Sequence, residues 1–428
     1  MRPSLGILSR NAILCCNRRN SEKRDETVSN PLPLQGIRVL DIGTLIAGPF
    51  GATMLGDFGA EVIKVEQPGR GDALRGTPQA DGTANRSTNW LVEARNKKSV
   101  TLNLRVEAGQ SILKEMIKHA DVLFENFTPG TLERWGLGWE EVRKINPKII
   151  MVRVSGYGQV GPYTKRSGYD RIALGFSGYM YPTGFPDRFP VRPAFPTADY
   201  NTGTFAALAT MFALYQRDMQ GGEGQMIDLA LYEPTFRITA NMMPNFFRDG
   251  EVRERIGNRN PTFSPAGTFE TKDGKYVQIA AGGDNVFQRL AAAMGMPELA
   301  EDKRYSTSRE RIARADELEA LLADWVGQQM FADIDKRFAD ANVPFGGIYT
   351  AEDISQDPHY AARENLATVS DEDEGDIVMP AVIPKMSETP GRIAHAGPAI
   401  GSYNDEIYGE LLGKSEEELA ALKKDGVI

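Results

Sequence analysis

The sequence predicts an α/β protein that begins with a doubly wound parallel sheet and continues into a smaller α+β domain. Two observations predict the sheet: short apolar runs recur through the first 155 residues, and stretches of helical pattern separate them. A third observation predicts the smaller domain, because past residue 236 a hairpin pattern is followed by two amphipathic stretches.

The first strand and its turn mark the expected ligand-binding edge of the sheet. Residues 36–43 form a short apolar run that predicts a buried strand, and residues 61–66 predict a second one. Between them, the small residues of 44–49 lead into a helical pattern that runs to residue 59. Strand, turn, helix and strand form a βαβ unit, and open α/β sheets bind ligands beyond the carboxyl ends of such strands.

The alternation continues along the chain. Further strands are expected at 99–103, 121–125, 149–154 and 225–229, and helices at 108–119, 132–145 and 204–216. An Asp-Gly turn predicts a hairpin of 262–269 with 276–280, followed by helices at 286–294 and 316–329. We therefore expect a large domain over 34–235, a small domain over 236–345, and a loop-rich remainder over 346–428. That remainder ends in a helix whose capping box is Ser415 and Glu418.

Composition excludes several functions. A net charge of −9 and a pI of about 5.2 oppose binding to nucleic acid or to an anionic lipid surface. No apolar run approaches the ~18 residues of a membrane-spanning helix, so we expect a soluble protein without a membrane partner. The only cysteines, Cys15 and Cys16, are adjacent, and they predict neither a disulfide framework nor a metal site.

Several motifs of other enzyme classes are missing from the sequence, which reduces the number of reactions to consider. No Gly-x-Gly-x-x-Gly follows the first strand, which disfavours a nicotinamide or flavin enzyme. The sequence also lacks a P-loop, a Gly-x-Ser-x-Gly elbow and a His-Glu-x-x-His motif. These reaction classes are therefore not expected.

The first 33 residues differ from the rest. They carry several arginines and serines among Leu and Ile, and no acidic residue precedes Glu22. This composition is typical of a mitochondrial transit peptide and predicts the mitochondrial matrix. The alternatives are a disordered tail or a misassigned start, with a cytoplasmic protein.

Several motifs together resemble one family. They are Asp41-Ile42-Gly43 with Ala47-Gly48-Pro49, the stretch 59–66, the stretch 125–130, Gly168-Tyr169-Asp170, and the tail 404–413. In order and spacing they match the class III coenzyme A transferases, the family of the formyl-CoA and carnitine-CoA transferases. The resemblance covers the chain from about residue 34 to its end, and is strongest to the succinyl-CoA:dicarboxylate transferases such as the glutarate enzyme.

The resemblance implies a structure and a set of binding residues. The large domain would be Rossmann-like, the C-terminal segment would return to it, and two chains would form an interlocked homodimer. Coenzyme A would bind as a substrate, and no permanently bound cofactor is implied. Its expected contacts are Ala47, Lys64, Asn126, Phe127 and Arg134.

Asp170 is the expected nucleophile. Its carboxylate would attack an acyl-CoA thioester to form an aspartyl anhydride and then an aspartyl-CoA thioester, from which a carboxylic acid takes the coenzyme A. Local sequence alone favours a different role, the capping of the helix that follows it. Gly282 and Gly283 are expected in a loop that closes over the site and excludes water. For the distal carboxylate of a dicarboxylate acceptor, Arg171 and Arg192 are the candidates.

Two other functions remain open at this point. An α-methylacyl-CoA racemase needs a His and Asp pair, and this chain has no histidine between His119 and His359. A non-catalytic acyl-CoA-binding protein is the second alternative. Among transferases, Ile46 stands where the formyl-CoA enzymes carry a glutamine, which disfavours oxalate as the acceptor. Carnitine, itaconate and hydroxy-dicarboxylates remain open as acceptors.

Overall fold

The computed structural model describes residues 30–76 and 86–428. The predicted transit peptide lies almost entirely outside the described residues. Among those residues, no helix combines the length and the apolar character that crossing a membrane requires.

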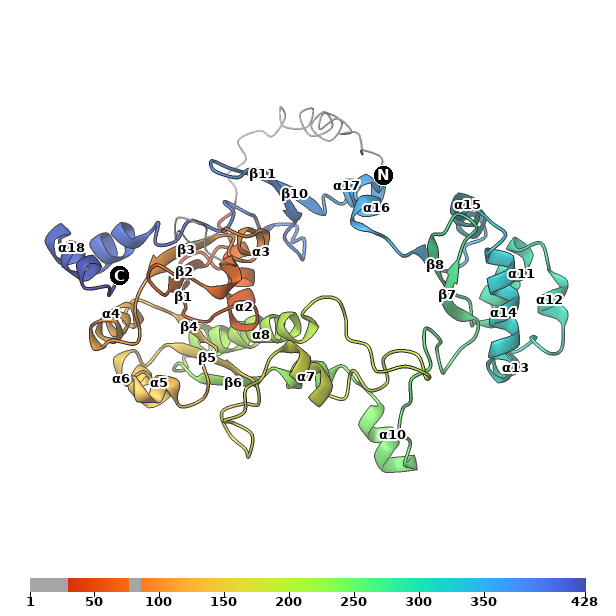
Figure 1. Ribbon diagram of the computed structural model, residues 1–428, viewed down its shortest axis with the longest axis horizontal. Helices are drawn as coiled ribbons and strands as arrows, with labels where there is room; N and C mark the ends of the chain where they lie inside the picture. Colours follow the sequence, from red (N-terminus) through yellow and green to blue (C-terminus); the bar gives the residue numbers. More distant parts are fainter. Residues whose placement is uncertain (1–29, 77–85) are drawn as a thin grey trace, which may run out of the picture.

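The large domain is built on a six-stranded parallel sheet (Figure 1). Its strand order is β3-β2-β1-β4-β5-β6, and every neighbouring pair is parallel. The strands are β1 (Arg38–Asp41), β2 (Glu61–Glu66), β3 (Lys97–Thr101), β4 (Val122–Glu125), β5 (Ile150–Ser155) and β6 (Met226–Ala230). The order reverses between β1 and β4, which confirms the predicted doubly wound sheet and places its switch point there.

Helices cover both faces of this sheet, and the strands are accordingly apolar on both sides. One face packs against α4 (Glu107–Ile117), α5 (Thr131–Arg134) and α6 (Trp139–Ile145). The other packs against α2 (Ala47–Asp57), α7 (Asp170–Phe176) and α8 (Thr197–Met219). The backbones of α2 and α8 approach closely, because a Cβ at Gly51 would lie 2.9 Å from the Gly203 oxygen. Short helices η1 (Ala73–Arg75), α3 (Thr88–Glu93) and α9 (Tyr232–Arg237) complete this domain.

The small domain contains a three-stranded antiparallel sheet with its own core. After α10 (Met242–Asp249), the chain forms the hairpin of β7 (Ala266–Glu270) and β8 (Tyr276–Ala280), and β9 (Phe345–Gly347) joins at the edge of β8. Its helices are α11 (Asp284–Ala293), α12 (Glu298–Glu301), α13 (Ser308–Ala313), α14 (Ala315–Val326) and α15 (Phe331–Asp340). Since β9 extends two residues past 345, the sheet crosses the boundary that we expected there. The domain boundaries themselves stay predictions.

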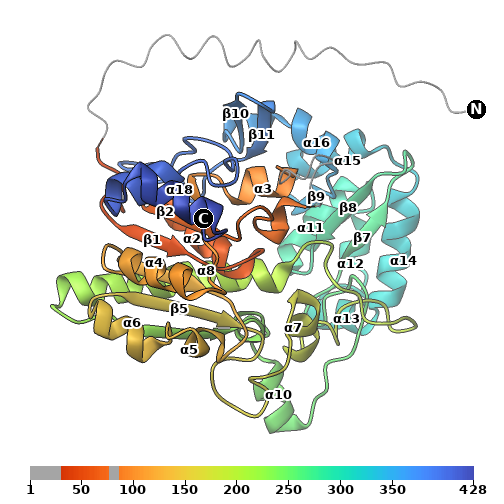
Figure 2. The ribbon, with the colours of Figure 1, turned by 60° about the vertical axis from the view of Figure 1, so that its left-hand side comes forward.

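The last segment leads back to the large domain (Figures 1 and 2). It contains α16 (Ala351–Gln356), α17 (Pro358–Ala362), the hairpin of β10 (Leu366–Asp371) and β11 (Gly375–Pro380), η2 (Asp405–Leu411) and α18 (Glu416–Lys424). Buried Tyr408 packs in the core of the large domain, and its hydroxyl donates to the Thr101 carbonyl at 2.8 Å. Ser415 and Glu418 form the predicted capping box. The expected return of the C-terminal segment is therefore confirmed.

Candidate active site

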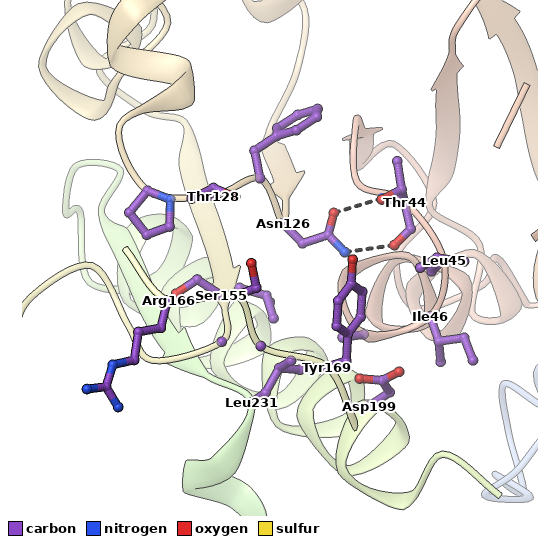
Figure 3. Close-up of a pocket in the computed structure, with 17 residues that line it drawn as sticks. Thr44, Leu45, Ile46, Asn126, Thr128, Ser155, Arg166, Tyr169, Asp199 and Leu231 are labelled. Carbon is purple, nitrogen blue, oxygen red and sulfur yellow. Dashed lines mark hydrogen bonds between the residues drawn. The ribbon is translucent and has the colours of Figure 1, made fainter. Parts of the chain in front are cut away.

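A pocket of about 200 Å³ lies at the switch point of the large sheet (Figure 3). It is lined by residues 44–47 after β1, 126–129 after β4, 154–156 at the end of β5, 166–169, Asp199 and Leu231. Parallel strands end on the same edge of a sheet, so loops that are far apart in sequence meet there. The structure thus places a pocket at the edge where the first βαβ unit predicted a ligand site.

Asn126 connects the two loops that flank the switch point. Its side-chain oxygen accepts from the Thr44 N–H at 2.8 Å, and its side-chain nitrogen donates to the Thr44 carbonyl at 2.7 Å (Figure 3). This double contact fixes the loop after β1 to the loop after β4. Ala47 and Phe127, two further expected CoA contacts, also line the pocket.

The loop after β1 holds an unusual backbone conformation. Leu45 has φ of +62°, a left-handed conformation that costs a non-glycine residue about 1–3 kcal/mol unless the surroundings enforce it. The Leu45 N–H donates to Asp72 Oδ1 at 3.1 Å. A Cβ at Gly43 would lie 3.1 Å from the Pro49 ring and 3.2 Å from the Asn126 oxygen, so this turn is packed tightly. The strained loop is thereby held from both sides.

Lys64 lies beneath this loop and not in the pocket. Its ammonium is 3.0 Å from Asp72 and 3.6 Å from Asp41, and it also donates to the Gly43 carbonyl. Burial opposes its charged form, but the charges of Asp41 and Asp72 outweigh burial and raise the pKa of Lys64. With its side chain 1% exposed, the predicted contact between Lys64 and coenzyme A is corrected: Lys64 supports the loop from below.

Asp170 is the first residue of α7, and its carboxylate is held by two other segments. Oδ1 accepts from the Ala198 N–H at 2.8 Å, in the first turn of the 23-residue helix α8. Oδ2 lies 3.6 Å from Arg192 Nη1 and has no hydrogen-bond partner among the described residues. The N-terminus of α8 and the guanidinium of Arg192 thus both face this carboxyl group.

This geometry differs from simple capping. The side chain of Asp170 makes no capping hydrogen bond to its own helix, whose N-cap is Tyr169. The backbone before it is packed against another loop, because a Cβ at Gly168 would lie 2.4 Å from the Gly156 Cα. Oδ2, the oxygen without a hydrogen bond, is a buried atom, and Asp170 is not among the residues that line the pocket. The role of Asp170 as the nucleophile therefore stays a prediction.

Sequence reasoning missed two charged residues of the pocket. Asp199 and Arg166 both line it, and Figure 3 shows them on opposite sides. Burial, and then the negative charge of Asp170, raise the pKa of Asp199 to about 7. The guanidinium of exposed Arg166 stacks on the Tyr163 ring at 3.7 Å. Arg166 follows a turn-rich stretch without a recognisable motif.

The remaining predicted residues lie outside the pocket lining. Arg134 is exposed on α5, where it donates to Thr131 at 3.0 Å, and Arg171 is exposed on α7. Gly282 and Gly283 belong to the small domain, where they line a different pocket. The binding roles of these four residues stay predictions. Arg171 directly follows Asp170 on α7, whereas the pocket of Gly282 and Gly283 is lined by residues of the small domain alone.

The histidines lie elsewhere. His119 and His359 are exposed, while His395 stacks on Tyr403 and lies 2.8 Å from the Ala396 carbonyl. None of the three lines the pocket. Within the described residues, no group of three or more His, Cys, Asp or Glu side chains could hold a metal ion. The geometry therefore offers no histidine partner for Asp170 of the kind that a racemase needs.

Comparisons with known proteins agree with this geometry. The family model described as CoA-transferase family III matches residues 34–404. The chain is 44% identical over 400 residues to a succinyl-CoA–D-citramalate CoA-transferase of Chloroflexus aurantiacus, covering 93% of this chain and 98% of the relative. It is 35% identical over 398 residues to the succinyl-CoA:glutarate CoA-transferase of Mus musculus, covering 92% and 90%. A solved CAIB/BAIF family protein from Brucella suis superposes with a TM-score of 0.80 at 33% identity, covering 89% of this chain and all of that one.

Proposed function

The chain belongs to CoA-transferase family III, and from this premise we propose that it moves coenzyme A from succinyl-CoA to a dicarboxylic acid through Asp170. The observation that carries the proposal is the carboxylate of Asp170 beside the pocket, held by the α8 N-terminus and by Arg192. Relatives at 33–46% identity are named for succinyl-CoA with citramalate, malate or glutarate. The sequence favoured glutarate as the acceptor and left the hydroxy-dicarboxylates open, and the names of these relatives support both.

The reaction begins when the Asp170 carboxylate attacks the succinyl-CoA thioester. The C–S bond breaks, which gives an aspartyl succinyl anhydride and the CoA thiolate. The thiolate then attacks the aspartyl carbonyl, releases succinate and leaves an aspartyl-CoA thioester. No net activation is needed, because each step exchanges one acyl partner for a chemically similar one.

The acceptor completes the cycle. Its carboxylate attacks the aspartyl-CoA thioester, forms a new anhydride and releases the thiolate. The thiolate attacks the acceptor's acyl carbonyl, so that the new acyl-CoA leaves and the Asp170 carboxylate is regenerated. Water must be kept away while the anhydrides exist, and the proposed closing loop of Gly282 and Gly283 would serve this purpose in an assembled enzyme.

Arg192 is suited to the distal carboxylate of the acceptor. It stands 3.6 Å from Asp170 in the resting site, and acylation removes the negative charge that it faces. Its guanidinium then becomes available to a carboxylate of the substrate, which it can bind in a bidentate manner. Arg171, the exposed residue that follows Asp170 on α7, is the second candidate.

The assembly and the location are part of the same proposal. We propose an interlocked homodimer and the mitochondrial matrix, where succinyl-CoA would be the donor. The apolar side chains exposed along α8, which include Phe212, Tyr215 and Met219 at 61–71%, support burial against a second chain. Size-exclusion chromatography with light scattering tests the dimer, and import of the chain with and without residues 1–33 tests the location.

Mass spectrometry of the acyl-enzyme tests the chemistry. After incubation with succinyl-CoA and trapping with neutral hydroxylamine, the peptide containing Asp170 should carry a hydroxamate. Asp170→Asn should abolish both the adduct and transfer to glutarate, malate and citramalate. The matched control is Asp187→Asn, at an aspartate of the same domain whose side chain is 75% exposed. This variant should behave as the unaltered enzyme. Absence of transfer to every dicarboxylate tested would refute the proposal.

A further inference from the structure

The parallel strands of the large domain end in buried polar residues. Of the six strands, all but β6 have such a last residue, at most 7% exposed: Asp41, Glu66, Thr101, Glu125 and Ser155. These ends form the edge of the sheet on which the pocket lies. A polar side chain that is buried there needs a hydrogen-bond partner, because an unpaired one loses its hydration without replacement.

Four of the five residues are paired within the protein, and Ser155 is not. The pairs have distances of 2.6–2.8 Å: Asp41 with Lys97, Glu66 with Arg75, Thr101 with Asn404 and Glu125 with Arg153. The Oγ of Ser155 is buried and has no hydrogen-bond partner within the described residues. Of these five strand ends, Ser155 is also the one that lines the pocket. The unpaired hydroxyl therefore belongs to the candidate active site.

The sheet fixes the position of Ser155. The residue pairs with Ala230 of β6, and its carbonyl accepts from the Leu231 N–H at 2.9 Å. The backbone that follows is packed against the segment before α7, because a Cβ at Gly156 would lie 2.7 Å from the Gly168 Cα. A hydroxyl on such a rigid element can hold a group of a ligand in one place.

The hydroxyl can meet a ligand without movement of the backbone. Figure 3 shows the Ser155 side chain among the pocket residues, directed toward the loop that carries Asn126 and Thr128. Its Oγ is covered in the free chain, but rotation about one bond moves a serine oxygen between three staggered positions. Asn126 already uses its side-chain oxygen and nitrogen on Thr44, so the Ser155 hydroxyl is available where the Asn126 amide is not.

We propose that Ser155 binds acyl-CoA by donating a hydrogen bond from its hydroxyl to a neutral carbonyl of the substrate. The inference rests on the proposed function in one respect, that acyl-CoA enters this pocket. Acyl-CoA has such carbonyls in the thioester and in both amides of its pantetheine arm. A carboxylate fits less well, because a buried charge needs a cation or several donors. Arg166 of the same pocket is better suited to the charged groups of the substrate.

A binding role and a structural role of Ser155 predict different changes in stability. A hydroxyl that is unpaired in the free chain contributes no hydrogen bond to folding, so Ser155→Ala should not lower Tm. The same substitution should weaken the complex with the substrate about tenfold, because in the free chain no other hydrogen bond of this hydroxyl has to be broken.

Ser264→Ala is the matched control. The Ser264 hydroxyl is also buried and unpaired within the described residues, but Ser264 precedes β7 and does not line the pocket. This variant should leave both Tm and the binding of CoA unchanged.

Two measurements test the proposal and identify the carbonyl. Free CoA contains the amides and lacks the thioester, so isothermal titration with free CoA is compared with kcat/KM for succinyl-CoA. If Ser155→Ala weakens the Kd for CoA and lowers kcat/KM by a similar factor, the hydrogen bond goes to an amide. If Kd for CoA is unchanged and kcat/KM alone falls, the bond goes to the thioester carbonyl.

The proposal is overturned if Ser155→Ala has the same Kd and the same kcat/KM as the unaltered enzyme. It is also overturned if Ser155→Ala lowers Tm, because the hydroxyl would then be a structural group. If the unaltered enzyme transfers CoA from succinyl-CoA to no dicarboxylate, the proposed function fails instead, and the titration with free CoA still tests the role of Ser155.

Discussion

Arg311 should determine the stability of the small domain, and its replacement by methionine gives a quantitative prediction. The side chain is fully buried. It donates to the carbonyls of Ser264, Tyr305 and Gly282 at 3.0, 2.8 and 2.7 Å, and to Asp284 at 2.7 Å. One guanidinium thus connects the segment before β7, the loop after β8 and the segment before α13.

The magnitude follows from these contacts. Each hydrogen bond from a charged group contributes about 1.5–3 kcal/mol, but the guanidinium also loses its hydration when it is buried. Methionine fills similar volume and leaves the three carbonyls without this donor. Because each buried carbonyl left without a donor costs about 1–3 kcal/mol, and Asp284 is more than half exposed and adds little, we expect the free energy of unfolding of the small domain to fall by about 3–5 kcal/mol. Arg311→Lys keeps the charge without the planar fork, and should recover less than half of the loss.

The assay uses the distribution of tryptophans. Trp325 is in the small domain, and the other three, Trp90, Trp135 and Trp139, are in the large domain. Urea unfolding of Arg311→Met, followed by hydrogen exchange resolved by peptide, should show early loss of protection in residues 266–345 with the large sheet unchanged. A loss below about 1 kcal/mol, or equal destabilisation of both domains, would refute the argument that Arg311 organises this loop.

Two further predictions concern the loops of the pocket and the C-terminal segment. Asn126→Leu removes both hydrogen bonds with Thr44. It should lower the free energy of unfolding by about 1–3 kcal/mol and raise KM for the CoA donor. An unchanged KM in steady-state kinetics would count against the role of Asn126 in connecting the loops after β1 and β4. For the β10–β11 hairpin, the hydrogen bond from Arg86 lowers the pKa of Asp371 to about 2. Because this pKa lies below the unfolded value, the stabilisation is present above pH ~4 and is lost as the pH falls toward 2. Hydrogen exchange of residues 366–380 should therefore accelerate as the pH falls through that interval. In Arg86→Gln, the same residues should exchange fast at both ends of the pH interval.

The sequence predicted the strands well where burial is continuous and less well where charges are buried. The strand expected at 99–103 begins at Lys97, because the Lys97 ammonium is paired inside the protein with Asp41 at 2.8 Å. Pattern analysis treats such a lysine as a surface residue. The helix expected from 204 begins at Thr197, although its first turn contains polar residues. Packing against α2 around Gly203 overrides the local preference.

The candidate site was also predicted only in part, because the sequence does not show which charged residues are buried or paired. Asp170, Ala47, Asn126 and Phe127 belong to contiguous motifs, so a resemblance could find them. The electrostatic interaction of Asp199 with Asp170, 29 residues earlier in the sequence, arises only in the folded chain. Lys64 was placed wrongly because sequence alone does not show that Asp41 and Asp72 lie on either side of its ammonium. Strand order and ion pairing are tertiary properties, and no local pattern encodes them.

The placement of charge in this site bears on which acids it accepts. Lys64 and Lys97 are neutralised beneath the loop by Asp41 and Asp72, so neither supplies a free cation to the pocket. The candidates for holding anionic groups are therefore Arg166, which lines the pocket, and Arg192, which lies 3.6 Å from Asp170. An arginine alone does not fix the length of the acid, and the loop after β1 lines the pocket with the apolar residues Leu45 and Ile46. We infer that this loop, and not the arginines, discriminates between acceptors, because an unpaired hydroxyl against Leu45 or Ile46 is unfavourable and a methylene is not. An Ile46→Gln variant should therefore shift the ratio of kcat/KM for malate over glutarate upward, and an unchanged ratio would place the discrimination elsewhere.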